Sequence, residues 1–88
     1  MITEVRLTPA PEHMVPRGML GWASFLIDGR LHAGGVAVRR SLQGRVYLSY
    51  PSRDDGWGRR WDYLKPIDDE TRREIERQVL EQLGEAVQ

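Results

Sequence analysis

The chain has 88 residues, no cysteine, and thirteen basic against thirteen acidic side chains. This length suits one domain, and the absence of cysteine excludes disulfides, thiolate catalysis and cysteine-ligated zinc sites. The apolar stretches are interrupted every few residues, so the composition predicts one soluble globular domain over residues 1–88 with no membrane insertion.

The first residues do not resemble an export signal, because residues 1–11 contain Glu4 and Arg6 among their hydrophobic side chains. Together with the lack of cysteine, this predicts a cytoplasmic location. A domain this small needs a further source of stability, and a second copy of the chain can cover apolar surface and sheet edges. We therefore expect a homodimer.

The middle of the sequence is electropositive although the net charge is zero. Residues 29–53 carry five arginines and no acid, whereas residues 1–28 sum to −1 and residues 54–88 to −4. Twelve of the thirteen basic residues are arginine, whose planar guanidinium suits phosphate. A GC-rich genome produces the same bias, so composition alone does not identify a polyanion binder.

The N-terminal part predicts one strand followed by a loop. Residues 2–8 mix β-branched and charged side chains, with Thr3, Val5 and Leu7 on one side, which predicts a half-exposed strand. Prolines then remove backbone donors and exclude a central strand or a helix, so residues 8–17 are predicted to form a surface loop. These prolines are Pro9, Pro11 and Pro16.

Residues 19–28 and 30–40 are apolar enough to form two well-buried strands. Asp28-Gly29 lies between them and predicts a two-residue hairpin turn, because both turn positions need positive φ. Gly34-Gly35 has no side chains to pack. It predicts a bulge or a close approach by another backbone, for which dimerisation is one reason.

Residues 45–50 alternate, with Val46, Leu48 and Tyr50 on one face, and predict a fourth strand. Residues 52–60 are charged and turn-forming, and residues 61–65 predict a short strand that pairs back to close a second hairpin. The sequence therefore predicts an antiparallel sheet of about five strands.

A helix is predicted over residues 68–86, after Pro66 and beside an acidic cluster at the positive end of the helix dipole. One arc of this helix is apolar and packs on the sheet, which gives an α+β fold. Its members are Ile75, Val79, Leu80, Leu83, Ala86 and Val87. The opposite side carries Glu70, Glu74, Arg77, Glu81 and Glu85.

Two segments combine arginine with aromatic side chains. The acid-free one suits phosphate binding and stacking, but a solvated strand rim with core aromatics is the favoured interpretation; it contains Arg39, Arg40, Arg45, Tyr47, Tyr50 and Arg53. In the glycine-hinged loop over residues 54–60, Trp57 beside Arg59-Arg60 is typical of a recognition surface, and packing of Trp57 over the sheet end is an equal alternative. A metal site from Asp54, Asp55 and Asp62 has weak support.

Arg73 and Arg77 form a basic edge on a helix whose exposed side is otherwise acidic. Intrahelical pairs with glutamate are the favoured interpretation of both. His13 and His32 have no serine or carboxylate pattern beside them, and no nucleotide-binding or metal motif is present. We therefore expect no enzyme activity, no cofactor and no metal.

Several segments form an ordered pattern over nearly the whole chain: Val5-Arg6-Leu7, the strands from Leu20 to Asp28 and Leu31 to Arg40, Val46 to Arg53 with Tyr50-Pro51-Ser52-Arg53, and Pro66-Ile67 before Thr71-Arg72 and Ile75. This pattern resembles the stage V sporulation protein G (SpoVG) family of septation regulators. The resemblance implies an antiparallel sheet with a C-terminal helix, a dimer that binds DNA or RNA, and control of cell division, septation and sporulation. The family often has histidine where this chain has Lys65.

The leading hypothesis is a non-catalytic dimeric regulator that contacts nucleic-acid phosphates and stacks bases on Trp57. The proposed phosphate contacts are Arg53, Arg59, Arg60, Lys65, Arg73 and Arg77. An alternative is a protein-interaction module that docks on a cell-division or signalling partner through Trp57, Tyr50 and an open sheet edge. A third is a structural homo-oligomer without a ligand.

Overall fold

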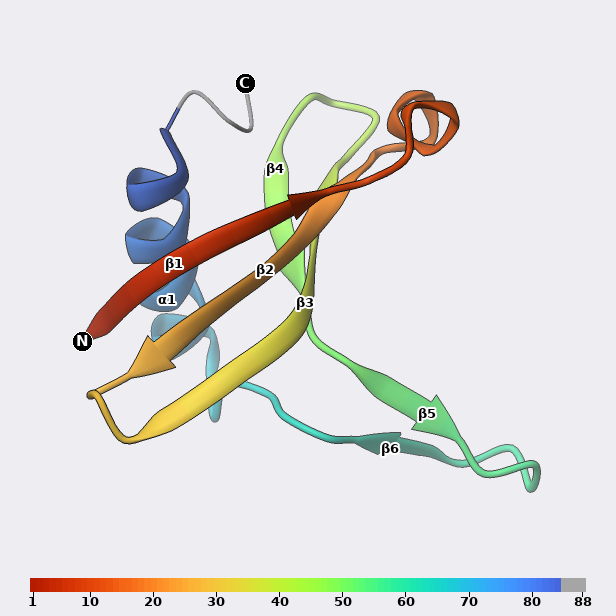
Figure 1. The fold of residues 1–88 in the computed structure, drawn as a ribbon. Helices are drawn as coiled ribbons and strands as arrows, with labels where there is room; N and C mark the ends of the chain where they lie inside the picture. The colour runs from red at the N-terminus through yellow and green to blue at the C-terminus, as the bar shows by residue number, and fades with distance from the viewer. Residues whose placement is uncertain (85–88) are drawn as a thin grey trace.

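The computed structural model describes residues 1–84 and shows an α+β fold (Figure 1). The elements in chain order are β1 (Ile2–Pro9), the 3-10 helix η1 (Glu12–Arg17), β2 (Met19–Ile27), β3 (Leu31–Arg40), β4 (Val46–Ser49), β5 (Ser52–Asp54), β6 (Arg60–Asp62) and α1 (Asp69–Leu83). Three predictions lie outside the described residues. They are the last two residues of the predicted helix (85 and 86), the apolar-arc positions Ala86 and Val87, and the exposed position Glu85.

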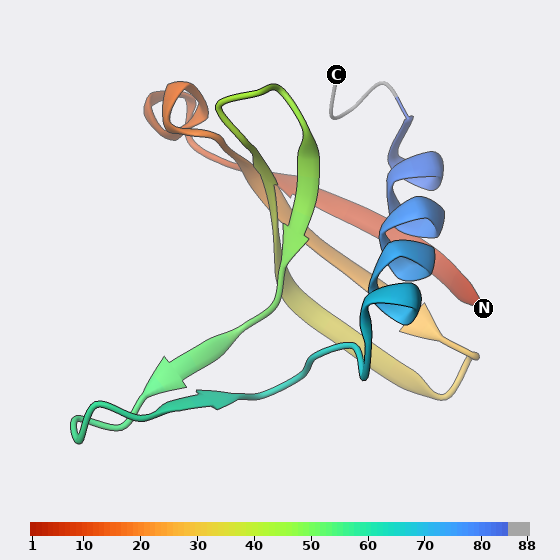
Figure 2. The same ribbon diagram turned by 180° about the vertical axis from the view of Figure 1, so that it is seen from behind.

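The first four strands form an antiparallel meander in the order β1-β2-β3-β4. Helix α1 lies against one face of this sheet, and Figures 1 and 2 show it behind and in front of β1 in the two opposite views. The other face is not covered by a helix within residues 1–84. Side chains of the sheet thus point either to the face that α1 covers or to the open face, and the alternating burial along β2 reflects this.

The prediction of one five-stranded sheet was wrong in its last part. Strand β6 does not join the main sheet, because it pairs with β5 in a separate two-stranded sheet in which Arg53 lies opposite Trp61. The segment predicted as a turn-forming loop thus begins as a strand. This hairpin, with residues 52–65, projects away from the body (Figures 1 and 2), and we call it the arm.

The proline-containing connection between β1 and β2 is also more ordered than the predicted surface loop. Residues Glu12–Arg17 form a 3-10 helix that includes Pro16 and ends at Gly18 with φ 90°. A 3-10 turn this short needs few backbone donors, so proline is compatible with it.

Glycines mark the places where the ladder of the sheet shifts or turns. Gly34-Gly35 forms the predicted bulge, with Gly35 at φ 66°, since Ala23 pairs with Val36 but Phe25 pairs with Ala33. The predicted turn has positive φ at both Asp28 (53°) and Gly29 (67°). The ladder resumes only at Leu31, so three residues rather than two separate the strands.

Strand β1 faces the core through a different set of side chains than its alternation predicts. A bulge between Thr3 and Arg6, with Glu4 at φ 53°, shifts the register against β2. As a result Ile2 is buried and Val5 and Leu7 pack beside it, whereas Thr3 is exposed. An inserted residue in a bulge reverses which side chains point to a given face.

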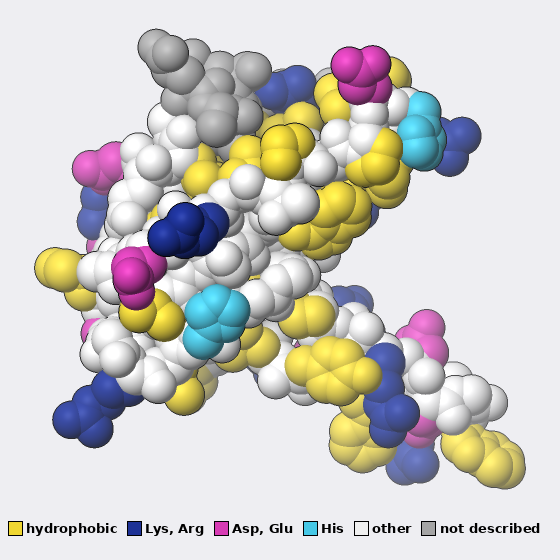
Figure 3. Space-filling view, viewed as in Figure 1, with side chains coloured by type: hydrophobic (Ala, Val, Ile, Leu, Met, Phe, Trp, Pro, Cys, Tyr) yellow, Lys and Arg dark blue, Asp and Glu magenta, His cyan; other side chains and the backbone are white. Residues whose placement is uncertain are grey.

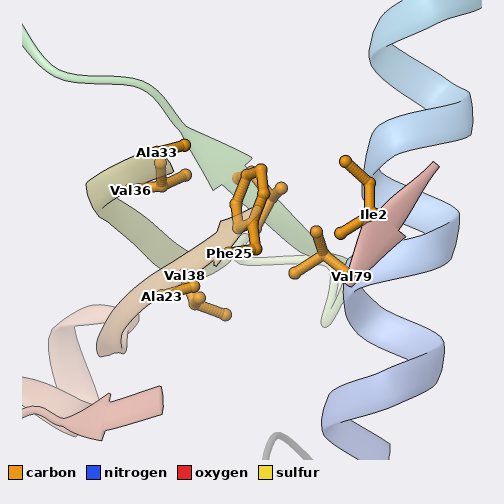
Figure 4. Packing of buried hydrophobic residues seen from close by; sticks show 8 residues of the cluster. Ile2, Ala23, Phe25, Ala33, Val36, Val38 and Val79 are labelled. Carbon is orange, nitrogen blue, oxygen red and sulfur yellow. The ribbon is translucent and has the colours of Figure 1, made fainter. Parts of the chain in front are cut away.

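The core lies between the helix-covered face of the sheet and α1. Figure 4 shows Phe25 of β2 directed toward Ile2 of β1 and Val79 of α1. The buried cluster consists of Ile2, Ala23, Phe25, Ala33, Val36, Val38, Leu48 and Val79. The predicted helix arc is confirmed at Ile75, Val79, Leu80 and Leu83, which all pack in or against this cluster.

Helix α1 begins after Asp68, whose side chain accepts a hydrogen bond of 2.8 Å from the Thr71 amide. This N-cap bond lowers the pKa of the Asp68 carboxyl. The helix is tied to the first edge strand by two glutamines: Gln78 Oε1 accepts from the Ile2 amide, and Gln82 Nε2 donates to the Ile2 carbonyl, both at 2.8 Å.

Glu76 ties the helix to the other edge strand. Its side chain is 6% exposed, and its carboxylate accepts hydrogen bonds from Arg45 Nη2 at 3.1 Å and from the Leu48 amide at 3.4 Å. Arg72 Nη1 lies 3.6 Å from the second carboxylate oxygen. This buried acid was not predicted, and it supplies the partner that the backbone of β4 lacks at the sheet edge.

We predict that Glu76→Ala lowers the free energy of unfolding by about 2–4 kcal/mol, because it leaves the buried Leu48 amide without its acceptor and removes the carboxylate that Arg45 and Arg72 share. Denaturant unfolding followed by tryptophan fluorescence measures this loss. Glu81→Ala is the matched control, since Glu81 is exposed on the same helix and, within residues 1–84, pairs only with Arg77; its effect should stay within about 0.5 kcal/mol. Equal losses in the two variants would contradict a special role for Glu76.

Candidate nucleic-acid interface

The tip of the arm is organised around Asp55. Its Oδ1 accepts hydrogen bonds from the amides of Trp57 at 2.8 Å and Arg59 at 3.2 Å, and its Oδ2 accepts from Trp61 Nε1 and Arg59 Nε, both at 3.0 Å. These bonds, led by those of Trp61 and Trp57, lower the pKa of the Asp55 carboxyl. Asp55 therefore stabilises the turn. Gly56 and Gly58 within this turn have positive φ, a conformation that glycine adopts without steric cost.

The arm exposes aromatic side chains on both sides of this turn. Trp57 is 85% exposed, Tyr63 is 67% exposed and Trp61 is 49% exposed. The Arg59 guanidinium lies 5.5 Å from the centroid of the Trp61 ring, in cation–π range. Figure 3 shows hydrophobic and basic side chains interleaved along the arm. Trp57 is thus exposed on the arm and does not pack over the end of the sheet.

Four of the predicted phosphate contacts lie on the arm, and three of them have a carboxylate nearby. Arg59 Nε is 3.0 Å from Asp55, Arg60 Nε is 3.5 Å from Asp62, and Lys65 Nζ is 3.6 Å from Asp62. Arg53 makes no ion pair within residues 1–84. The Asp62 carboxylate thus lies near two cations, Arg60 and Lys65. The arm has four basic and three acidic residues between 52 and 65, which gives it a net charge of +1.

The other two predicted contacts lie on α1 and are not part of the arm. Arg77 bridges Glu74 at 2.6 Å and Glu81 at 2.9 Å, as the intrahelical interpretation predicts. Hydrogen bonds from Arg77 and Gln78 lower the pKa of Glu74 to about 2. Arg73 is exposed and has no ion pair in the described part of the chain. Figure 2 shows that α1 and the tip of the arm lie at opposite sides of the molecule.

A cleft of about 430 Å³ lies where the arm leaves the body. It is lined by Leu48, Ser49, Tyr50, Arg60, Asp62, Lys65, Pro66 and Arg72. The sequence did not predict that Arg72 lies in one cleft with Arg60 and Lys65. No local pattern marks this association, because the three cations come from two elements and a connecting segment.

The Tyr50 hydroxyl is buried beside this cleft and has no hydrogen-bond partner among the described residues. Burial, and to a smaller extent the negative charge of Glu76, raise the pKa of the Tyr50 phenol to about 12, while the positive charge of Arg72 opposes this shift. The sequence predicted Tyr50 to share a face with Leu48, and its ring packs against the core cluster accordingly.

Some classes of site are absent from residues 1–84. No group of three or more histidine, aspartate or glutamate side chains there is placed to hold a metal ion. No helix in that part of the chain is long and apolar enough to cross a membrane. Comparison with known proteins identifies no relative: no protein-family profile matches the chain, and no curated protein sequence is significantly similar to it.

We predict that stability falls as the pH rises from 10 to 12, in a manner that depends on Tyr50. The unfolded phenol ionises near pH 10 while the folded one keeps its proton to about pH 12, so the contribution of the neutral phenol is complete below pH 10 and is lost through this window. Tyr50→Phe should remove this part of the pH dependence. Below pH 10 it should change the free energy of unfolding by less than about 1 kcal/mol, because no protein hydrogen bond is lost.

The measurement is an ultraviolet absorbance titration of the wild type minus that of Tyr50→Phe, together with denaturant unfolding below pH 10 and between pH 10 and 12. The difference spectrum should show a phenolate step near pH 12. A step near pH 10 would mean that the hydroxyl is solvated.

Proposed function

We propose that this protein binds nucleic acid, DNA or RNA, through the arm. The observation that carries the proposal is the arrangement at the tip, where Trp57 is 85% exposed on a turn that four hydrogen bonds to Asp55 hold in place. An exposed indole on an ordered turn offers a stacking surface for an unpaired base, and stacking of this kind contributes about 1–3 kcal/mol per base. The neighbouring arginines then supply phosphate contacts.

The ion pairs of the arm do not prevent such contacts. The side chains of Arg59, Arg60 and Lys65 are each about two-thirds exposed. Exposed ion pairs contribute about 0–1 kcal/mol, so a phosphate can compete for these cations. The Arg59–Asp55 pair differs from the other two pairs, because the Asp55 carboxylate is only 12% exposed and is bound within the turn. Arg53 supplies a charge without a carboxylate partner in residues 1–84.

The wider role that we propose is that of a non-catalytic, cytoplasmic and dimeric regulator of septation and sporulation. The order of segments from Val5-Arg6-Leu7 to Ile75, which resembles SpoVG proteins, supports it. A dimer presents two arms to one strand of nucleic acid, and two modest sites linked in this way bind with a higher effective affinity.

The second candidate function is docking on a cell-division or signalling protein. It is favoured by the large apolar side chains that the arm and the segment after it expose, because such side chains anchor protein interfaces. These are Trp57, Trp61, Tyr63 and Ile67. This function requires no surplus of positive charge.

We predict that Trp57→Ala weakens binding of a single-stranded oligonucleotide by about 1–3 kcal/mol, or roughly 5- to 150-fold. Fluorescence anisotropy or a gel-shift titration measures the change. Arg30→Ala is the control, because Arg30 is exposed in the β2–β3 turn, away from the arm, and makes no ion pair within residues 1–84. It should leave the affinity within about twofold of wild type.

Salt dependence gives a separate prediction. If a dimer neutralises four to eight phosphates, the logarithm of the affinity should fall against the logarithm of the salt concentration with a slope of roughly −4 to −7 for duplex DNA and roughly −3 to −6 for a single strand. Arg59→Ala with Arg60→Ala should reduce the magnitude of that slope by about 2 per arm. Unchanged binding by this double variant, or binding insensitive to salt, would exclude the arm as a phosphate-binding surface. Salt-tolerant capture of a protein partner, lost in Trp57→Ala, would favour the second function.

A further inference from the structure

A second cleft, larger than the one at the base of the arm, lies at the opposite end of β4. Its volume is about 770 Å³. It lies between the end of η1 and the loop that joins β3 to β4, which run side by side in both ribbon views (Figures 1 and 2). The cleft is lined by Val15, Pro16, Arg17, Gly18, Arg39, Arg40, Ser41, Leu42, Gln43 and Tyr47.

The lining contains three arginines and no carboxylate among the residues that the structure describes. Arg17 and Arg39 make no ion pair within residues 1–84. This distinguishes them from Arg59, Arg60 and Arg77, which all lie beside carboxylates. Guanidinium groups that converge without neutralising acids produce a local positive potential, which a bound anion would relieve.

The position of Arg17 in this cleft is fixed by the backbone. The Gly18 carbonyl accepts a hydrogen bond of 2.7 Å from the Arg40 amide, and the Gly18 amide donates to the Val15 carbonyl at 2.9 Å. Gly18 has φ 90°, and a Cβ atom there would lie 2.4 Å from the Arg40 carbonyl oxygen. Only glycine permits this close approach, so η1 and the end of β3 are held together before any ligand binds.

The cleft combines charge with an aromatic ring. Tyr47 lies directly opposite Arg39 in the β3–β4 ladder, so the two side chains share the face of the sheet that α1 does not cover. Leu42 is fully exposed and Val15 is 40% exposed at the rim. Arginine forks pair with phosphate oxygens, and a phenol ring with apolar neighbours suits the flat face of a base.

We propose that this cleft binds a phosphate ester, with Arg17 and Arg39 on the phosphate and Tyr47 against the attached base. The source is either a mononucleotide or a backbone phosphodiester of nucleic acid. The proposal does not rest on the function of the arm, because the cleft shares no lining residue with it. The acid-free segment around Arg39, for which a structural role was the favoured interpretation, takes part in the proposed site because Arg39 and Arg17 line the same cleft.

The test is an amide NMR titration of the full chain with adenosine monophosphate, with adenosine, and with a short oligonucleotide that lacks terminal phosphates. Adenosine monophosphate or the oligonucleotide should shift the amides of Gly18, Arg40 and Ser41 in a saturable way, and adenosine should bind at least about tenfold more weakly. Tighter binding of the oligonucleotide identifies the backbone as the source, and tighter binding of the mononucleotide identifies a free nucleotide.

Variants separate this site from the arm. Arg17→Ala should weaken binding in the cleft by about tenfold, and Arg17→Ala with Arg39→Ala by about a hundredfold, whereas Arg30→Ala should leave it unchanged. Arg17 is exposed, so its single substitution keeps the test valid if the double variant misfolds. The proposal is overturned if neither phosphate-bearing probe shifts the cleft amides, if adenosine binds as tightly as its phosphate, or if Arg17→Ala binds like Arg30→Ala.

Discussion

The attachment of one helix to both edge strands of the sheet determines the shape of this protein. Glu76 accepts from Arg45 and from the Leu48 amide on the β4 side, and Gln78 and Gln82 bond to both backbone groups of Ile2 on the β1 side. A four-stranded open sheet has unpaired backbone at each edge, and these polar side chains satisfy part of it. Because polar bonds fix the helix at both edges, the apolar contacts of Val79 and Phe25 lie at a defined place between them.

This attachment leaves the end of β4 free to continue into the arm. Tyr50 still packs against the core cluster. Strand β5, which follows, pairs with β6 and not with a strand of the main sheet. A two-stranded hairpin has little core of its own, so its order depends on local hydrogen bonds. Asp55 supplies them at the tip. The Asp55 carboxylate also forms an ion pair with Arg59, one of the proposed phosphate contacts. A phosphate must therefore compete with Asp55 for this guanidinium.

The two ends of β4 show how a chain of zero net charge separates its charges in space. Some arginines that are close in sequence to acids are paired with them, as Arg77 is with Glu74 and Glu81, whereas Arg53 and Arg73 have no ion pair within residues 1–84. Arg17 and Arg39 lie far apart in the chain, in segments with few acids, and the fold brings them to one cleft. The arginine-lined cleft therefore depends on residues that are distant in the chain, whereas the basic clusters at residues 59–60 and 73–77 are local in sequence.

The sequence by itself determined the elements whose side-chain period is regular. Apolar runs predicted β2 and β3, alternation predicted β4 and the extent of β1, the 3.6-residue period predicted the apolar arc of α1, and Gly34-Gly35 predicted its bulge. These features depend on local backbone geometry. Local pattern also marked Trp57 and the arginines of the arm, but not their ion pairs.

The tertiary structure alone decided that β6 lies outside the main sheet, that Glu76 is buried, and that Arg17 and Arg39 line the same cleft. A short charged strand carries no information about which edge it will pair with. A glutamate in a helix has the same sequence signature whether it meets solvent or a distant arginine. The partners that settle these questions come from segments far apart in the chain, and only packing brings them into contact.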